Sequence, residues 1–140
     1  MSKAFAFAGA RVGYLAADAT LIDALRLVRL PYHLSALTQA AATAALSHSS
    51  TMLRMVDEIV AQRDRMSATL DALGYHAYES WTNFVLFDGV DDPRATWQAL
   101  YDRGILVRDV GIPHSLRVSA GTEDETTAFL EALASIDSEA

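Results

Sequence analysis

The chain has 140 residues, enough for one domain of ordinary size, and its 51% hydrophobic content predicts a packed core rather than disorder. The formal net charge of −7 argues against a nucleic-acid partner and against an anionic membrane surface. The absence of cysteine excludes disulfides, thiolate catalysis and cysteine-based zinc sites, and it is compatible with a reducing cytoplasm, where we expect the protein.

The N-terminal segment contains the only lysine of the chain, Lys3, between Ser2 and a short apolar run at residues 4–8. An amine nucleophile must be largely unprotonated, and a poorly solvated pocket lined by such a run would favour that state. Arg11 and Gly9 suit the binding of a phosphate ester. An arginine can donate two parallel hydrogen bonds to phosphate oxygens, and small residues let backbone N–H groups approach the phosphate. A solvated lysine is the alternative that these residues leave open.

A secretory signal is a second interpretation of the same segment, since one early positive charge precedes the apolar residues. The apolar run at residues 4–10 is short for a signal, and Arg11 interrupts it. It is also far below the roughly 20 residues that span a bilayer. We therefore favour an internal, buried role for this segment.

Residues 10–17 are predicted to form a short buried strand, followed by a helix from Thr20 to Leu30. Thr20 and Asp23 resemble a capping box, and Pro31 ends the helical pattern. A buried strand needs pairing partners on both sides, and no nearby run supplies them. We therefore expect that a segment normally preceding this strand is missing from the chain.

Two further helices are predicted before Gly74, where the sequence pattern changes from helical to mixed helix and strand. Ser35 or Thr38 can cap an alanine-rich helix that extends to about Leu46. Residues 51–73 have apolar side chains with period 3.6, and Gly74 fits the left-handed position that ends a helix. The length of this second helix is typical of a connector between two domains.

The remainder predicts a small α+β domain of order β-α-β-β-α, with its helices packed on one face of the sheet. The expected strands are residues 75–79, 83–88, 105–108 and 116–119. Asp92-Pro93 starts a helix that buries Trp97, Leu100 and Tyr101, and Thr122 with Glu125 forms a capping box for the last helix.

Arg108 and Arg117 lie nine residues apart at the ends of two apolar strands, around a Gly/Pro turn. A partly buried guanidinium requires an anion. One interpretation is that the two arginines form ion pairs with Asp88, Asp109 or Glu123. The other is that both guanidinium groups bind an anionic substrate.

The four histidines do not form a metal-binding pattern. None of His33, His48, His76 and His114 has the spacing of a His-x-x-x-His or Glu-His pair, so we predict no metal site. His114 lies in the turn between the two arginines and is expected to be a solvent-facing loop residue.

The N-terminal segment resembles the Schiff-base segment of fold-type I pyridoxal-phosphate enzymes, in which a Ser-Lys pair precedes an apolar run ending in Gly-x-Arg. Ser2-Lys3 and Gly9-Ala10-Arg11 carry this resemblance. It implies that Lys3 holds pyridoxal 5'-phosphate (PLP) as an imine, and that Ser2 and Arg11 bind the phosphate of the cofactor.

The second half is similar to histidinol-phosphate aminotransferases. The matching stretches are Ile105-Leu-Val-Arg-Asp109, Leu116-Arg-Val-Ser-Ala-Gly-Thr-Glu123, Asn83-Phe-Val85 and the Pro31-Tyr32 turn. The resemblance implies that Arg117 binds the carboxylate of the amino donor or the substrate phosphate, and that Arg108 helps to hold the phosphate. Asn83 and Tyr32 are expected to support the site rather than to react.

The resemblance also implies an architecture, the C-terminal part of a fold-type I transferase of the α/β class. Residues 1–30 would be a remnant of the PLP-binding large domain, residues 31–73 connecting helices, and residues 74–140 the small α+β domain. The family's other cofactor-binding residues precede the lysine. We therefore expect the chain alone to be inactive or nearly so.

The expected activity of the full-length parent, a homodimer, is transfer of an amino group from histidinol phosphate to 2-oxoglutarate in histidine biosynthesis. Its partner would be a small anionic substrate, with no nucleic acid and no membrane. Two alternatives remain open at this stage: an aromatic amino-acid aminotransferase of the same subfamily, and a stand-alone interaction domain without a cofactor.

Overall fold

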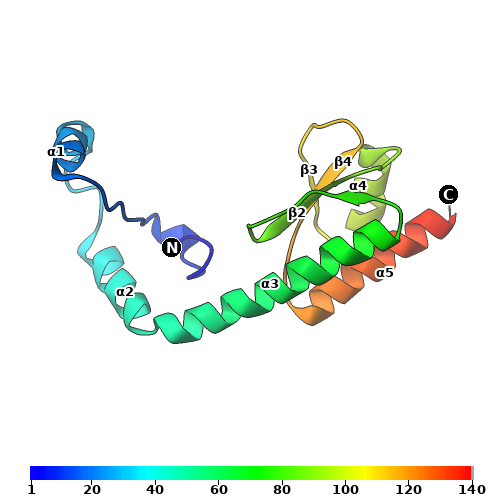
Figure 1. Ribbon diagram of the computed structural model, residues 1–140, viewed down its shortest axis with the longest axis horizontal. Coiled ribbons are helices and arrows are strands. Elements are labelled where there is room, and N and C mark those ends of the chain that lie inside the picture. The colour runs from blue at the N-terminus through cyan, green and yellow to red at the C-terminus, as the bar shows by residue number, and fades with distance from the viewer. Residues whose placement is uncertain (140) are drawn as a thin grey trace. The chain divides into compact units, whose positions relative to one another are not determined.

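The computed structural model describes residues 1–139, so Ala140, the last residue of the predicted small domain, lies outside the described residues. The chain divides into two compact units, Met1–Val56 and Asp57–Ala140. The boundary falls inside helix α3, Ser49–Ala72 (Figure 1). The predicted division at residues 30 and 73 stays a prediction.

The first unit contains the 3₁₀ turn η1 (Ala8–Ala10), helix α1 (Ala19–Val28), helix α2 (Ala36–Ser47) and the start of α3. Ser35 caps α2 as predicted, since its Oγ accepts a hydrogen bond from the Thr38 N–H at 3.0 Å. The predicted capping box of α1 is wrong. Asp18 caps that helix instead, because its carboxylate accepts the Thr20 N–H at 2.8 Å.

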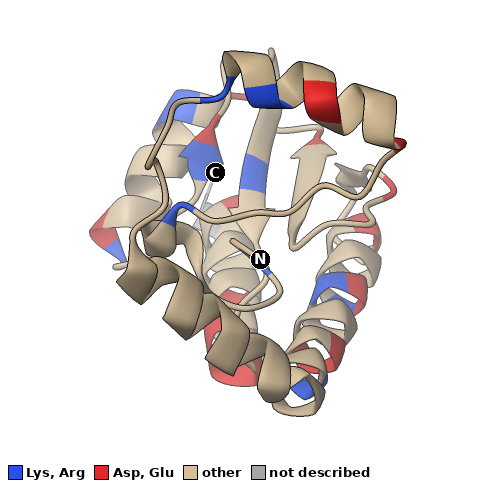
Figure 2. Cartoon of the chain, turned by 90° about the vertical axis from the view of Figure 1, so that its left-hand side faces the viewer, with Lys and Arg blue, Asp and Glu red and all other residues tan. Residues whose placement is uncertain are grey.

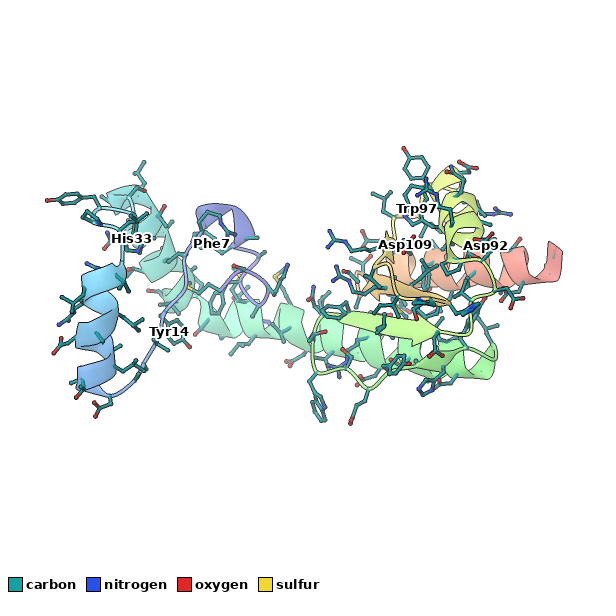
Figure 3. The ribbon with its side chains drawn as sticks, turned by 90° about the horizontal axis from the view of Figure 1, so that it is seen from above. Phe7, Tyr14, His33, Asp92, Trp97 and Asp109 are labelled. Atoms are coloured by element: carbon teal, nitrogen blue, oxygen red, sulfur yellow. The ribbon has the colours of Figure 1, made fainter. Side chains whose placement is uncertain are left out.

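The buried strand predicted at residues 10–17 is absent. The segment after η1 has no regular structure, and Tyr14 and Leu15 are 83% and 61% exposed (Figure 3 labels Tyr14). The strand does not form because none of the described residues pairs with it, and an unpaired extended segment gains no ladder hydrogen bonds.

Helix α1 has no buried residue, although its sequence is rich in leucine. The large apolar side chains on and after it are exposed, namely Leu21, Leu25, Leu27, Val28 and Leu30. Ala42 is the only buried residue among residues 1–56. The first unit therefore presents apolar surface of the kind that proteins normally cover with other structure.

Helix α3 ends as the sequence predicts. Gly74 has a φ of +97°, which is favourable only for glycine. The Tyr75 N–H donates to the Leu70 carbonyl and the Gly74 N–H to the Asp71 carbonyl, both at 3.1 Å. These two bonds are those of a Schellman motif, and they turn the chain from α3 into the sheet.

The second unit contains a four-stranded sheet of order β1-β2-β4-β3 in which every neighbouring pair is antiparallel. The strands are β1 (His76–Ala77), β2 (Phe84–Asp88), β3 (Arg108–Asp109) and β4 (Ser115–Ser119). The predicted strand at 105–108 is displaced, because the indole Nε1 of Trp97 donates to the Val107 carbonyl at 3.0 Å in place of a neighbouring strand.

One face of this sheet forms the core of the second unit. Val85, Phe87, Leu116 and Val118 project into it and are at most 4% exposed. They pack against Met66 and Leu70 of α3, Leu100 of α4 (Pro93–Asp102), and Phe129 and Leu133 of α5 (Glu123–Glu139). This confirms the α+β class and the placement of the helices on one face of the sheet.

Both predicted cap signals of the second unit are confirmed. The Asp92 carboxylate accepts the N–H groups of Arg94 and Ala95 at 3.0 Å, with Pro93 as the first residue of α4. Thr122 and Glu125 form a reciprocal capping box before α5. Burial of Tyr101 was predicted wrongly. It is 51% exposed and stacks on Trp97, with ring centroids 5.3 Å apart.

Candidate functional site

Arg108 and Arg117 face each other across the β3–β4 pair. They are Cα partners in an antiparallel register, so their side chains leave the same face of the sheet. Figure 2 colours the Lys and Arg positions blue along the backbone. Leu116 and Val118, on either side of Arg117, are buried on the core face, which places both arginines on the opposite face. Directly opposed residues have Cβ atoms about 4.5–5.5 Å apart, so the two arginine side chains start close together.

Neither arginine has a carboxylate partner in the part of the chain that the structure describes. Among residues 1–139, the structure forms no ion pair at Arg108 or Arg117. Two of the carboxylates considered for this role bind elsewhere: Asp88 Oδ2 accepts the Tyr78 hydroxyl at 2.6 Å, and Asp109 Oδ1 accepts the Gly111 N–H at 2.8 Å. The opposed pair therefore has two positive charges that no nearby protein group neutralises.

Arg117 is the more enclosed of the two arginines. Its Nε is buried and has no hydrogen-bond partner among the described residues, which is rare for a charged donor. The guanidinium carbon lies over the ring of Phe84, 4.7 Å from the ring centroid. A buried donor without a partner is costly to the free protein. A guanidinium on the face shared with Arg108 is chemically suited to an anionic ligand.

Arg108 also lines an open groove beside helix α4. The groove has a volume of about 480 Å³ and is lined by Arg94, Trp97, Val107, Arg108, Asp109 and Gly111. Figure 3 labels Trp97 and Asp109 at this end of the second unit. Arg94 lies over the Trp97 ring, 5.4 Å from its centroid. Arg108 is exposed at this groove, whereas Arg117 is partly buried.

His114 is held by the backbone rather than free to meet a ligand. Its φ is +57°, and its Nδ1 lies 3.0 Å from the Val90 carbonyl oxygen. The His114 carbonyl in turn accepts the Val90 N–H at 3.1 Å. These two contacts fix the turn that leads into β4. Its side chain is exposed, as the sequence predicted.

Phe84 begins β2 and lies on the same face of the sheet as the arginines, and Asn83 directly precedes the strand. The Asn83 carbonyl accepts the Ala120 N–H at 2.9 Å, which extends the β2–β4 pairing by one residue. Sequence analysis gave no role to Phe84. Its contact with Arg117 depends on strand register, which the sequence does not specify. The one feature that could have suggested the contact is an aromatic residue at the start of a strand.

Ser2, Lys3 and Arg11 all lie in the first unit, close together in sequence. Lys3 and Arg11 are exposed, and Ser2 is partly buried. Arg11 has a φ of +50°, and its Nη1 donates to the Ala8 carbonyl at 3.0 Å. Ala4, Ala6 and Ala8 are also exposed, so the run expected to wall a pocket around the lysine does not enclose it within residues 1–56.

Among residues 1–139, no group of three or more His, Asp or Glu side chains is placed to bind a metal ion. None of the helices in the same described part combines the length and apolar character needed to cross a bilayer.

Residues 1–133 match the family model described as aminotransferase class I and II. The chain is 59% identical over 133 residues to a histidinol-phosphate aminotransferase of Paenarthrobacter aurescens, covering 95% of this chain and 36% of the relative. It is 58% identical over 132 residues to the enzyme of that name from Mycolicibacterium smegmatis, covering 94% of this chain and 35% of the relative.

Solved structures agree with this match. The crystal structure of histidinol-phosphate aminotransferase from Sinorhizobium meliloti, in complex with pyridoxal-5'-phosphate, superposes with a TM-score of 0.80 at 30% identity, over 99% of this chain and 40% of that one. The enzyme of the same name from Clostridium acetobutylicum gives a TM-score of 0.86 at 21% identity, over 100% of this chain and 45% of that one, which supports the fold alone.

The chain spans about a third of the length of the curated relatives it matches. Its helices and small antiparallel sheet are those of part of a fold-type I aminotransferase. Because the family model covers residues 1–133, the chain belongs to the aminotransferase class I and II family.

Proposed function

We propose that the chain contributes the lysine segment and the small domain of a PLP-dependent histidinol-phosphate aminotransferase. The overall reaction would move the amino group of histidinol phosphate to 2-oxoglutarate. The observation that supports this best is the opposed pair Arg108 and Arg117, which has no anionic partner among the described residues. The names of the relatives at 58–59% identity favour the phosphorylated substrate.

The two arginines would divide the work of substrate binding. The guanidinium of Arg117 would donate to a carboxylate or phosphate that approaches the open face of the sheet. Arg108, on the edge strand and exposed, would close on the phosphate from the other side. An anion between the two guanidinium groups relieves their mutual repulsion. The free energy of anion binding therefore becomes more favourable by the amount of repulsion that is relieved.

The residues of the first unit fit PLP by their chemistry. Lys3 offers an accessible amine, and Ser2 and Arg11 offer a hydroxyl and a guanidinium suited to a phosphate. Within the described residues, one guanidinium nitrogen of Arg11 is engaged, by the Ala8 carbonyl, which leaves its other guanidinium N–H groups to donate. PLP, when bound, supplies an electron sink for the substrate carbon. Lys3 Nζ would accept and return the proton of that carbon.

The chain alone is proposed to have little or no transaminase activity. It corresponds to about 36% of the relative from P. aurescens, and its lysine segment is exposed rather than enclosed. We propose that the full-length parent is a homodimer.

Titration calorimetry tests the substrate assignment on the chain as it stands, with histidinol phosphate, histidinol and phenylalanine as ligands. We expect histidinol phosphate to bind and histidinol to bind far more weakly. Arg117→Gln should weaken binding by roughly 10- to 100-fold, the value of one or two charge-assisted hydrogen bonds. Arg54→Gln on α3 is the control, since that side chain donates hydrogen bonds to Ser50 and Thr51 of its own helix.

The same experiment separates the alternatives. Preference for phenylalanine over histidinol phosphate would favour an aromatic amino-acid aminotransferase. Absence of any binding that depends on Arg108 or Arg117 would favour a domain without a substrate site and would overturn the proposal.

A further inference from the structure

We infer that Phe84 is a positioning residue for Arg117: its ring holds the guanidinium in place and keeps it unpaired for an incoming anion. This inference rests on the proposed anion-binding role of Arg117. It adds a residue that neither the motif comparison nor the opposed arginine pair identifies.

The strand register brings the two side chains together. In the β2–β4 pair, Leu86 lies opposite Arg117 and Phe84 lies opposite Ser119. Phe84 is therefore a diagonal neighbour of Arg117 on the open face of the sheet, within reach of long and aromatic side chains. The result is the 4.7 Å separation between the Arg117 guanidinium carbon and the Phe84 ring centroid.

The chemistry of the ring explains why Arg117 Nε lacks a partner. A phenyl face attracts a cation electrostatically but offers no hydrogen-bond acceptor. Phe84 can therefore hold the guanidinium without neutralising it, whereas a carboxylate in that place would occupy the N–H donors. The ring also covers the cation from water, and hydrogen bonds and charge attraction are stronger at a less hydrated site.

The backbone of Phe84 is itself fixed by the turn that precedes β2. The hydroxyls of Ser80 and Thr82 both donate to the Phe84 carbonyl, and the Phe84 N–H donates to Thr82 Oγ1 at 3.3 Å. Arg63, a buried residue of α3, donates from Nη1 to the Thr82 carbonyl at 3.4 Å. A ring attached to so constrained a backbone has a defined position, as a positioning role requires.

Nitrogen-15 NMR of the arginine Nε–Hε group tests the inference directly on the 140-residue chain. The Arg117 signal is assigned by its loss in Arg117→Lys. A proton near an aromatic face is shifted by the ring current, and a buried N–H exchanges slowly with water. We expect Phe84→Leu to remove the ring-current shift and speed that exchange, and Phe84→Tyr to retain both properties.

A titration with inorganic phosphate provides the functional measurement. Phe84→Leu should raise the phosphate dissociation constant roughly fivefold, the effect of losing one partly buried cation–π contact, and Phe84→Tyr should restore binding. Leu106→Ala, at a side chain that is 76% exposed, is the matched control and should change neither readout. A structural role alone would not distinguish leucine from tyrosine in this way.

The outcomes separate this inference from the proposed function. If Arg117→Gln abolishes phosphate binding and Phe84→Leu leaves both the NMR signal and the affinity unchanged, the positioning role is wrong and the anion site stands. If Arg117→Gln leaves phosphate binding unchanged, the anion site itself is wrong. An unchanged Arg117 signal in Phe84→Leu contradicts the inference even if phosphate binds too weakly to measure.

Discussion

Arg108 and Arg117 are directly opposed in the antiparallel pair β3–β4, and neither has a carboxylate partner within the described residues. Like charges in this position destabilise a sheet. The opposed pair therefore lowers the stability of the free protein, and an anion bound between the two side chains would offset this loss. The stability of the chain and its affinity for anions should therefore be linked.

Removing one of the opposed charges should stabilise the free chain. We expect Arg108→Gln to raise the free energy of unfolding by about 0.2–1 kcal/mol at low ionic strength, because the cross-strand repulsion is lost. The same variant should lose the stabilisation that phosphate gives to the wild type. Urea unfolding with and without phosphate measures both effects, and Arg54→Gln serves as the control. A destabilised Arg108→Gln would contradict the repulsion argument.

The cap of α4 should matter measurably for the stability of the second unit. Asp92 accepts two backbone N–H groups, and Asp92→Ala would leave both without this partner. We expect a loss of about 1 kcal/mol, the usual effect of removing such a cap. Urea unfolding measures it. Asp91→Ala, next to the cap and also exposed, should be nearly neutral, and equal losses in the two variants would refute a capping role.

The capping box of α5 predicts a pH dependence. Hydrogen bonds from the Thr122 backbone N–H and hydroxyl hold the pKa of the Glu125 carboxyl below its ordinary value. A lowered folded-state pKa contributes stability that is present above the unfolded-state pKa, about 4.3, and is lost as the pH falls through the folded-state pKa. Glu125→Gln should therefore flatten the decline in stability below about pH 4.3.

Denaturant unfolding between neutral pH and about pH 3 measures this decline, a range set by the carboxyl pKa values. Glu131→Gln on the same helix is the control, since Glu131 is also exposed and lies outside the capping box. If both variants change the pH profile to the same extent, net charge rather than the cap explains the result.

Local signals in the sequence predicted the second unit well. Asp92-Pro93, Gly74 and the Thr122–Glu125 spacing each act through backbone groups within a few residues, so their effect does not depend on the rest of the fold. The strand at 83–88 was found because an apolar run suits a strand with core contacts. Asp18 was missed as a cap, because Thr20 also fits the residue type.

The remaining errors arise where distant residues decide the outcome. The segment at 10–17 is apolar enough for a strand, but only a pairing partner could make it one. The strand predicted at 105–108 is displaced because the Trp97 indole N–H donates a hydrogen bond to the Val107 carbonyl. The opposition of Arg108 to Arg117 and the stacking of Phe84 both follow from register, which hydrophobic pattern and spacing do not specify.

Borohydride trapping followed by mass mapping tests the claim that Lys3 belongs to a PLP-binding segment. The chain would be incubated with PLP or with pyridoxal, which lacks the phosphate, and then reduced. We predict that PLP labels Lys3 in preference to the N-terminal amine, that pyridoxal labels it less, and that Arg11→Gln removes the difference. Equal labelling of Lys3 and the N-terminal amine by both aldehydes, unchanged in Arg11→Gln, would contradict the claim.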